Sequence, residues 1–170
     1  MGQEVAVLLH NVRSAHNVGS IFRTADAAGV SKIYLSGYTP APCDRFGRVQ
    51  KEIAKTALGA ERSVLWERVA SAGSLISRLK HAGWRVVGVE QDERASDYRK
   101  FRLKGPALFI FGNEVRGISQ AVRAKCDALI EIPMRGTVVR QAHHPRHTRR
   151  GKESLNVSVA AGVILFFSRS

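Results

Sequence analysis

The chain of 170 residues carries 27 Lys and Arg against 14 Asp and Glu, which gives a formal net charge of +13. A hydrophobic fraction of 44% excludes a wholly disordered protein, and the length fits one domain with a buried core. The charge favours a polyanionic partner, nucleic acid rather than a membrane surface, although a basic protein without such a partner would have the same composition.

Short β-prone runs alternate with helical patterns along the chain. We expect strands at 5–9, 32–36, 85–90, 107–112 and 128–133, with a less regular one at 63–67. We expect helices at 18–28, 47–57, 68–82, 119–125 and 155–168. Several strands are apolar throughout, which is typical of parallel strands covered on both faces. The pattern predicts an open α/β fold, a parallel six-stranded sheet with helices on both faces.

The first predicted helix has a capping residue at its start, a glycine at its end and one apolar face. Asn17 is a suitable N-cap and Gly29 a suitable stop. The apolar positions at helical spacing are Val18, Ile21, Phe22, Ala25 and Ala28. Arg23 falls nearly opposite this stripe, where it could be an ordinary solvated arginine paired with Asp26 one turn later.

The apolar strand "ALFIFG" runs into the loop "NEVRGIS", which supplies Asn113, Glu114 and Gly117 after Gly112. Ligand sites of open α/β sheets lie at such strand ends. The spacing resembles a phosphate-binding loop, but Ile118 stands where its lysine should be, and the chain has no GxGxxG. ATP and dinucleotide sites are therefore unsupported, and a plain glycine-containing connection remains an alternative.

The stretch from Ile132 to Ser158 joins a strand end to an apolar helix through a basic segment. That segment, Thr137–Gly151, holds four arginines, three histidines and no acid. Ser154 and Asn156 lie where polar side chains commonly cap a helix. The apolar run that follows them is too short to span a membrane and indicates a buried helix.

Three stretches, in order along the chain, resemble the signature motifs of the SpoU (TrmH-like) branch of the SPOUT RNA methyltransferases: "NVRSAHNVGSIFRTADAAGV", "FGNEVRGIS" and "IPM…SLNVSVAAGVILF". The resemblance covers essentially the whole chain. It implies methyl transfer from S-adenosylmethionine to a ribose 2′-hydroxyl of tRNA or rRNA. It also implies a homodimer and a C-terminal trefoil knot. Independently of the resemblance, we expect neither a membrane nor a metal as a partner.

The resemblance assigns residues to the cofactor and to catalysis. Gly112, Ile132 and Leu155 would contact the cofactor, largely through backbone groups. The catalytic assignments are Arg23, Asn17, Glu114, Ser154 and Asn156. Because arginine is a poor proton acceptor, we expect Arg23 to bind an RNA phosphate or polarise the hydroxyl, whose proton leaves to phosphate or water. The arginines expected to bind RNA are Arg13, Arg116, Arg140, Arg146, Arg149 and Arg150.

The basic segment Thr137–Gly151 interrupts the third motif. Joining "IPMRG" directly to "KESLNVS" would restore the motif. We interpret the segment as an insertion into a single domain, 1–170, whose arginines could add phosphate contacts. A metal site at His143, His144 and His147 is an alternative, but no cysteine or carboxylate nearby completes the set.

These observations favour a minimal, single-domain RNA 2′-O-methyltransferase. Two other readings stay open: a non-catalytic RNA-binding paralogue whose cofactor loop the insertion disrupts, and a metal-dependent regulator built on the histidines. Cys43 and Cys126 lie far apart without CxxC spacing, which suits a reducing, cytoplasmic location.

Overall fold

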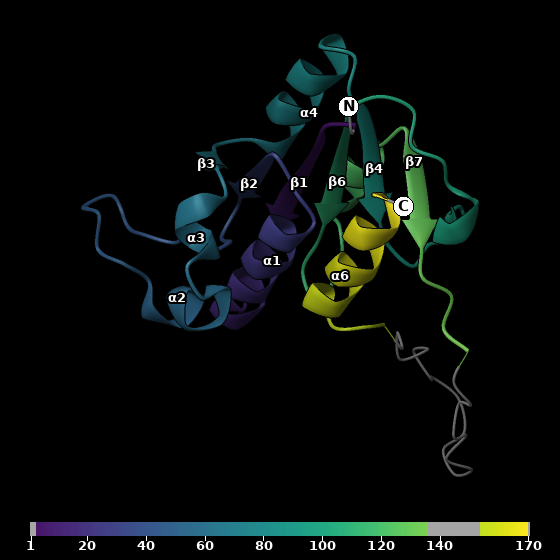
Figure 1. Ribbon diagram of the computed structural model, residues 1–170. Helices are drawn as coiled ribbons and strands as arrows, with labels where there is room; N and C mark the ends of the chain where they lie inside the picture. The colour runs from purple at the N-terminus through teal and green to yellow at the C-terminus, as the bar shows by residue number, and fades with distance from the viewer. Residues whose placement is uncertain (1–2, 136–153, 170) are drawn as a thin grey trace, which may run out of the picture.

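The computed structural model describes residues 3–135 and 154–169, which form a parallel sheet between two layers of helices (Figure 1). The strands are β1 (Val5–His10), β2 (Lys32–Ser36), β3 (Trp66–Val69), β4 (Arg85–Val89), β5 (Ser96–Asp97), β6 (Ala107–Phe111) and β7 (Ala128–Glu131). Their order is β3-β2-β1-β6-β4-β7-β5, and every pair is parallel. The predicted parallel α/β sheet is therefore confirmed.

The predicted number of six strands was wrong, because the described part of the chain has seven. The additional strand, β5, pairs Ser96 with Ile130 and Asp97 with Glu131 at the edge of the sheet. A two-residue polar strand has no hydrophobic period, so the sequence does not reveal it.

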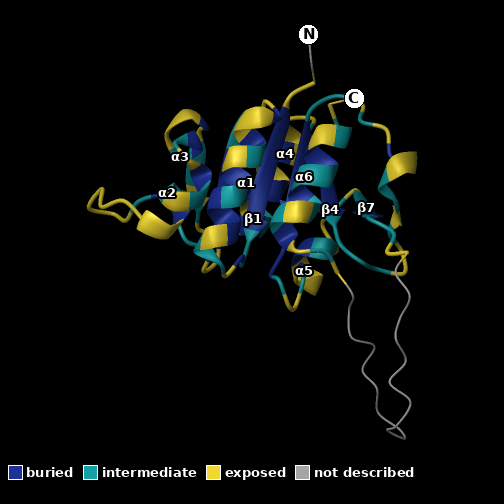
Figure 2. Cartoon of the chain, turned by 60° about the horizontal axis from the view of Figure 1, so that its bottom comes forward, coloured by how far each residue is buried: buried dark blue, intermediate teal, exposed yellow. Residues whose placement is uncertain are grey.

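Helices cover both faces of the sheet. They are α1 (Ala15–Ala27), α2 (Lys51–Ala57), α3 (Ala60–Ser63), α4 (Ala72–His81), the 3-10 turn η1 (Tyr98–Lys100), α5 (Gln120–Arg123) and α6 (Val157–Phe167). Residues of α1, α2, α3 and α6 share one apolar core, and residues of α4 and α5 share the other. Figure 2 shows α1 and α6 side by side over the sheet, with their buried sides turned toward it.

The central strand β1 connects the two cores. Val5, Val7 and Leu9 belong to the core under α1 and α6, whereas Ala6 and Leu8 belong to the core under α4. All five are fully buried, as alternation on a doubly covered strand requires. Because the strands are parallel, their carboxyl ends meet at one edge of the sheet.

The first helix begins earlier than predicted. Its N-cap is Ser14, whose Oγ accepts a hydrogen bond from the backbone N–H of Asn17 at 3.2 Å, so the predicted cap at Asn17 was wrong. The apolar stripe is buried as predicted, and Gly29 follows the helix with φ +67°, which confirms the stop. The early start places Asn17 inside the helix and leaves its side chain available for other contacts.

Helix α2 packs closely against α1 at Gly19. A Cβ at Gly19 would lie 2.0 Å from Thr56 Oγ1 and 2.4 Å from the Ile53 carbonyl oxygen, so only glycine fits there. Thr56 also donates a hydrogen bond to the carbonyl of His16 at 3.1 Å. The two helices are therefore joined by both packing and a hydrogen bond.

Two further expectations concern the chain as a whole. No helix within the described ranges is long and apolar enough to cross a membrane. The trefoil knot stays a prediction, because part of the chain between β7 and α6 lies outside the described residues.

Candidate active site

A cavity of about 210 Å³ lies where the carboxyl ends of β4, β6 and β7 meet the start of α6. The three residues expected to contact a cofactor, Gly112, Ile132 and Leu155, all line it. Three of the residues expected to be catalytic, Glu114, Ser154 and Asn156, line it as well. The fold thus brings the second and third motifs to one cavity.

The carboxylate of Glu114 fastens this cavity to the start of α1. Its Oε2 accepts the backbone N–H of Arg13 at 3.0 Å, and its Oε1 accepts that of Ser14 at 3.1 Å. Oε1 also accepts the side-chain amide of Asn17 at 3.1 Å. The Oδ1 of Asn17 in turn accepts the side-chain amide of Asn156 at 3.2 Å. We refer to Glu114, Asn17 and Asn156 as the polar cluster, in which each of the three motifs contributes one residue.

Hydrogen bonds set the charge state of Glu114. Burial on its own would raise the pKa of this carboxyl group, but donation by the backbone N–H groups of Arg13 and Ser14, its own N–H and the Asn17 amide lowers the pKa below 4.5. Glu114 is therefore a charged acceptor at neutral pH. Its arrangement suits holding Asn17 and the start of α1 rather than donating a proton.

The loop after β6 is shaped by Asn113 and two glycines. Asn113 donates to the Asn11 carbonyl and the Tyr38 hydroxyl, at 3.1 and 3.0 Å, while its Oδ1 accepts the N–H groups of Val115 and Arg116. A Cβ at Gly112 would lie 2.4 Å from the Gly117 carbonyl carbon, and Gly117 itself has φ +67°. The loop folds back on itself so tightly that both positions require glycine.

Glu90 is a lining residue that the sequence analysis missed. Its Oε2 accepts the N–H of Ile118 at 2.7 Å and so holds the loop after β6 against β4. A Cβ at Gly117 would come within 1.9 Å of the same oxygen. An acid directly after the apolar run "RVVGV" was the signal that could have identified it.

The expected arginines occupy different places. Arg13 and Arg116 are exposed, and their backbone N–H groups bond to Glu114 and Asn113. Arg23 is exposed on α1 and does not line the cavity, and its guanidinium has no hydrogen bond or ion pair with any described residue. The alternative pairing with Asp26 is absent within the described ranges, where Asp26 accepts a hydrogen bond from Ser63 instead.

The remaining candidates lie outside the described residues. They are Arg140, Arg146, Arg149 and Arg150 for RNA, and His143, His144 and His147 for metal. Among residues 3–135 and 154–169, no group of His, Cys, Asp and Glu could hold a metal ion.

Fold and site together define a class. It is that of parallel α/β proteins with a ligand cavity at the carboxyl ends of the strands. The cavity here is lined by glycines, apolar side chains, amides and three carboxylates, those of Glu90, Glu114 and Glu131.

Within this class the chain belongs to the SpoU rRNA Methylase family, whose model matches residues 4–140. It is 34% identical over 165 residues to the 23S rRNA (guanosine-2'-O-)-methyltransferase RlmB of Ralstonia nicotianae, covering 97% of this chain and 58% of that protein. The chain thus spans less than two thirds of this relative's length. The family resemblance of the three motifs is confirmed.

Solved structures agree with this assignment. The AdoMet-bound rRNA methyltransferase from Sinorhizobium meliloti is 30% identical with a TM-score of 0.80, covering 99% of this chain and 57% of that chain. The SpoU methyltransferase AviRb from Streptomyces viridochromogenes, in complex with the cofactor AdoMet, is 26% identical with a TM-score of 0.80, covering 99% of this chain and 60% of that chain.

Proposed function

We propose that this chain carries the catalytic domain of an RNA methyltransferase, which transfers a methyl group from S-adenosylmethionine to a ribose 2′-hydroxyl of rRNA or tRNA. The observation that carries the proposal is the cavity, where Gly112, Ile132 and Leu155 meet the polar cluster. Family membership and a relative named as a guanosine-2'-O-methyltransferase support the reaction type. Such RNA lies in the cytoplasm, where we propose that the protein acts.

The cavity suits S-adenosylmethionine chemically. Backbone amide and carbonyl groups beside Gly112, Ile132 and Leu155 would serve an uncharged adenine, and the apolar side chains would cover its faces. Glu90 and Glu131 also line the cavity, and their carboxylates would attract a cationic ligand in an otherwise basic chain. When bound, S-adenosylmethionine supplies an electrophilic methyl group on a positively charged sulfur.

The protein's contribution to the reaction is mainly positioning. The polar cluster would hold the ribose against the methyl group, with Asn156 at the cavity and Glu114 fixing Asn17. In this arrangement the ribose oxygen would take the methyl group that S-adenosylmethionine supplies, forming the bond to carbon as the bond from carbon to sulfur is broken. The hydroxyl proton leaves to an RNA phosphate or to water, because a guanidinium such as that of Arg23 accepts no proton near neutral pH.

The position of Arg23 suggests a second copy of the chain. Arg23 does not line the cavity of its own chain, although its motif match assigns it to catalysis. Val159 and Phe166 on the neighbouring helix α6 are 51% and 53% exposed. We therefore propose a homodimer formed over α1 and α6, in which Arg23 of one copy serves the cavity of the other.

Calorimetry with S-adenosylmethionine, followed by transfer of a labelled methyl group to total RNA, tests this function. Alkali cleaves RNA through the free 2′-hydroxyl, so a 2′-O-methylated linkage should resist alkaline hydrolysis and identify the modified nucleotide. Binding of cofactor without transfer to any RNA would contradict the proposed activity. If the protein binds RNA but does not bind S-adenosylmethionine, the result would favour the non-catalytic RNA-binding alternative.

A further inference from the structure

A finger projects from the domain between β2 and α2. It comprises residues 43–49 and extends away from the sheet (Figure 1). Cys43 and Val49 pair as an antiparallel bridge at its base, and Gln50 N–H donates to the Pro42 carbonyl at 2.8 Å. The finger is therefore a hairpin with a defined base.

Asp44 fixes the shape of the finger's tip. Its Oδ1 accepts the N–H groups of Phe46 and Arg48, at 2.8 and 3.0 Å, and its Oδ2 accepts Arg48 Nε at 2.8 Å. Gly47, with φ +78°, makes the turn and donates to the Asp44 carbonyl. The tip thus holds its conformation through local hydrogen bonds rather than through burial.

An aromatic ring at this tip lies close to two cations. The Phe46 side chain is 67% exposed, and the guanidinium carbons of Arg45 and Arg48 lie 4.7 and 5.1 Å from its ring centroid. Covering a large exposed apolar ring with a partner lowers the free energy, because apolar surface leaves water. Arg45 makes no ion pair with any residue of the described ranges, so its charge remains available to a phosphate.

A hollow of about 640 Å³ lies between the finger and the edge strand β3. Trp66 and Arg68 of β3 line one side, and Cys43, Arg45 and Arg48 of the finger line the other. Trp66 and Arg68 pair with Ile33 and Leu35, so they lie on the same face of the sheet as α1. The volume is within the range of roughly 300–1,000 Å³ that is usual for small-ligand sites.

Arg68 joins the finger's root to the sheet. Its guanidinium donates to the carbonyl oxygens of Gly37 and Thr39, in the segment that leaves β2. The hollow consequently combines an indole ring with three guanidinium groups, and the exposed ring of Phe46 lies on the finger beside it. It does not include any residue of the cavity at β6 and β7.

We infer that this hollow and the finger bind an unpaired nucleotide of the RNA substrate, away from the nucleotide that is methylated. The base stacks on Phe46 or Trp66, and Arg45 contacts a flanking phosphate. Unpaired bases are recognised by stacking on aromatic rings and arginine planes, whereas paired bases are not free to enter such a site. The inference rests on the proposed function, since it names a part of the same substrate.

Charge favours RNA over a protein segment here. The chain carries +13, and the one acid among the described residues that line the hollow, Asp44, is paired with Arg48. The carboxylates of an acidic peptide would satisfy the guanidinium groups but would offer no flat ring to Phe46 and Trp66. An RNA base with its phosphates satisfies both.

The experiment uses Trp66 as its own reporter. The chain has two tryptophans, so Trp84→Phe leaves Trp66 alone. Short single-stranded RNA should quench its fluorescence, and a duplex of equal length should not. In the same background, Phe46→Ala should weaken single-stranded RNA binding about tenfold, within the range for loss of one stacked base. Arg45→Gln should lower the salt slope of binding by about one, whereas Phe46→Ala should leave the slope unchanged.

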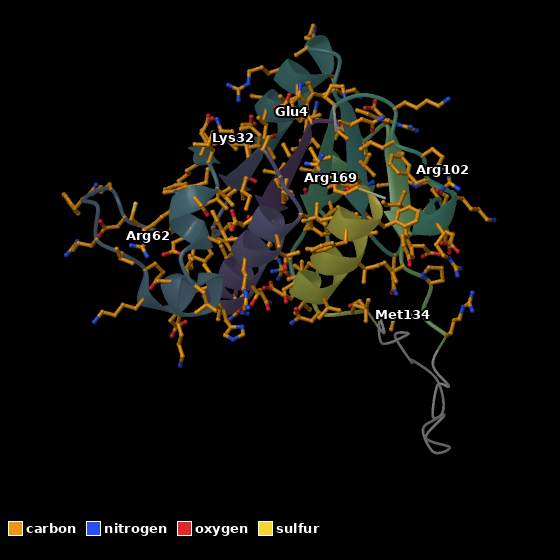
Figure 3. The ribbon with its side chains drawn as sticks, viewed as in Figure 1. Glu4, Lys32, Arg62, Arg102, Met134 and Arg169 are labelled. Atoms are coloured by element: carbon orange, nitrogen blue, oxygen red, sulfur yellow. The ribbon has the colours of Figure 1, made fainter. Side chains whose placement is uncertain are left out.

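Two matched variants control for exposure and charge. Leu65→Ala removes a side chain that is 69% exposed, close to the 67% of Phe46. Arg102→Gln removes one exposed charge on the other side of the molecule from the finger (Figure 3). Neither should alter the Trp66 signal or the affinity for single-stranded RNA.

The outcomes separate this inference from the proposed function. Unchanged Trp66 fluorescence at saturating RNA, in protein that still binds S-adenosylmethionine and methylates RNA, overturns the inference alone. Quenching by an acidic peptide but not by RNA also overturns it and points to a protein partner. If the unmodified chain binds cofactor but methylates no RNA, the proposed function fails whatever Trp66 reports.

Discussion

The side-chain amide of Asn17 donates a hydrogen bond to Oε1 of Glu114 at 3.1 Å, although 97 positions separate the two residues. Asn17 is only 7% exposed, so this bond replaces water that the amide has lost. Glu114 holds the start of α1 through the same carboxylate. The helix that carries Arg23 is thereby fixed to Glu114, the residue of the second motif that lines the cavity.

Glu114→Gln should make the protein less stable by roughly 1–3 kcal/mol at neutral pH, the range for donors left without a charged acceptor. The pKa of Glu114 is below 4.5 in the folded protein, so the unfolded chain binds more protons as the pH falls. The difference in unfolding free energy between the unmodified protein and Glu114→Gln should be largest above pH 4.5 and should shrink below it. Urea unfolding across this range measures it. Glu93→Gln, at an exposed position, is the control, and a pH-independent difference would contradict the expectation.

Arg23→Ala should lower methyl transfer about a hundredfold, which corresponds to roughly 2.7 kcal/mol, and leave S-adenosylmethionine affinity nearly unchanged. The guanidinium is exposed and does not line the cavity, so its loss should not disturb folding. Arg78→Ala, on α4 across the sheet, serves as the matched control.

Mixing two inactive variants tests whether Arg23 acts on a second copy. A hybrid of Arg23→Ala and Asn156→Ala chains has one complete site if Arg23 serves the partner's cavity, so part of the activity should return. If Arg23 served its own cavity, both sites in the hybrid would be defective. No recovery in a mixture shown to contain hybrids would then count against the shared site.

RNA affinity should fall steeply with salt, because Lys and Arg side chains release counterions from phosphates. A plot of log K against log salt concentration measures the number of contacts. Arg116→Gln, an exposed position between the cavity-lining residues Val115 and Gly117, should lower the slope by about one. Arg78→Gln on the other face should leave it unchanged, and a flat plot for the unmodified protein would exclude an electrostatic RNA interface.

The protein should have the mass of a dimer by light scattering at micromolar concentration. Val159→Glu places a charge on the exposed apolar side of α6 and should shift the mass to that of a monomer. Leu58→Glu is the control, since Leu58 is 66% exposed at the end of α2. A monomeric mass for the unmodified chain would refute the homodimer.

Deleting Thr137–Gly151, a segment outside the described residues, should leave a folded protein that binds S-adenosylmethionine. The junction then reads "IPMRGKESLNVS", which restores the uninterrupted motif. Stability should change little, because closure entropy depends only logarithmically on the length of a connection. RNA affinity should fall with a smaller salt slope, as four arginines are removed. Loss of cofactor binding with an unchanged circular dichroism spectrum would show that the segment is part of the cofactor site.

Local patterns were sufficient for the six longer strands and for the end of the first helix. The apolar runs predicted the major strands, and the glycine at position 29 predicted the end of α1. The cap of α1 was mispredicted because Ser14 and Asn17 are both good capping residues, and Glu114 decides between them from a distant loop. The polar cluster itself depends on sheet order, which single-sequence periodicity does not contain. Glu90, which the sequence did not reveal, accepts a hydrogen bond from the backbone N–H of Ile118, in the loop after β6.

The close contact at Gly19 has a consequence for the RNA. Helix α2 follows directly after the finger, and it packs without a gap on the helix that carries Asn17 and Arg23. If RNA occupies both the finger and the polar cluster, the distance between these two contact sites depends on how closely α2 packs on α1 at Gly19. Selection of the nucleotide to be methylated would then depend on its distance from an unpaired neighbour as well as on its own identity.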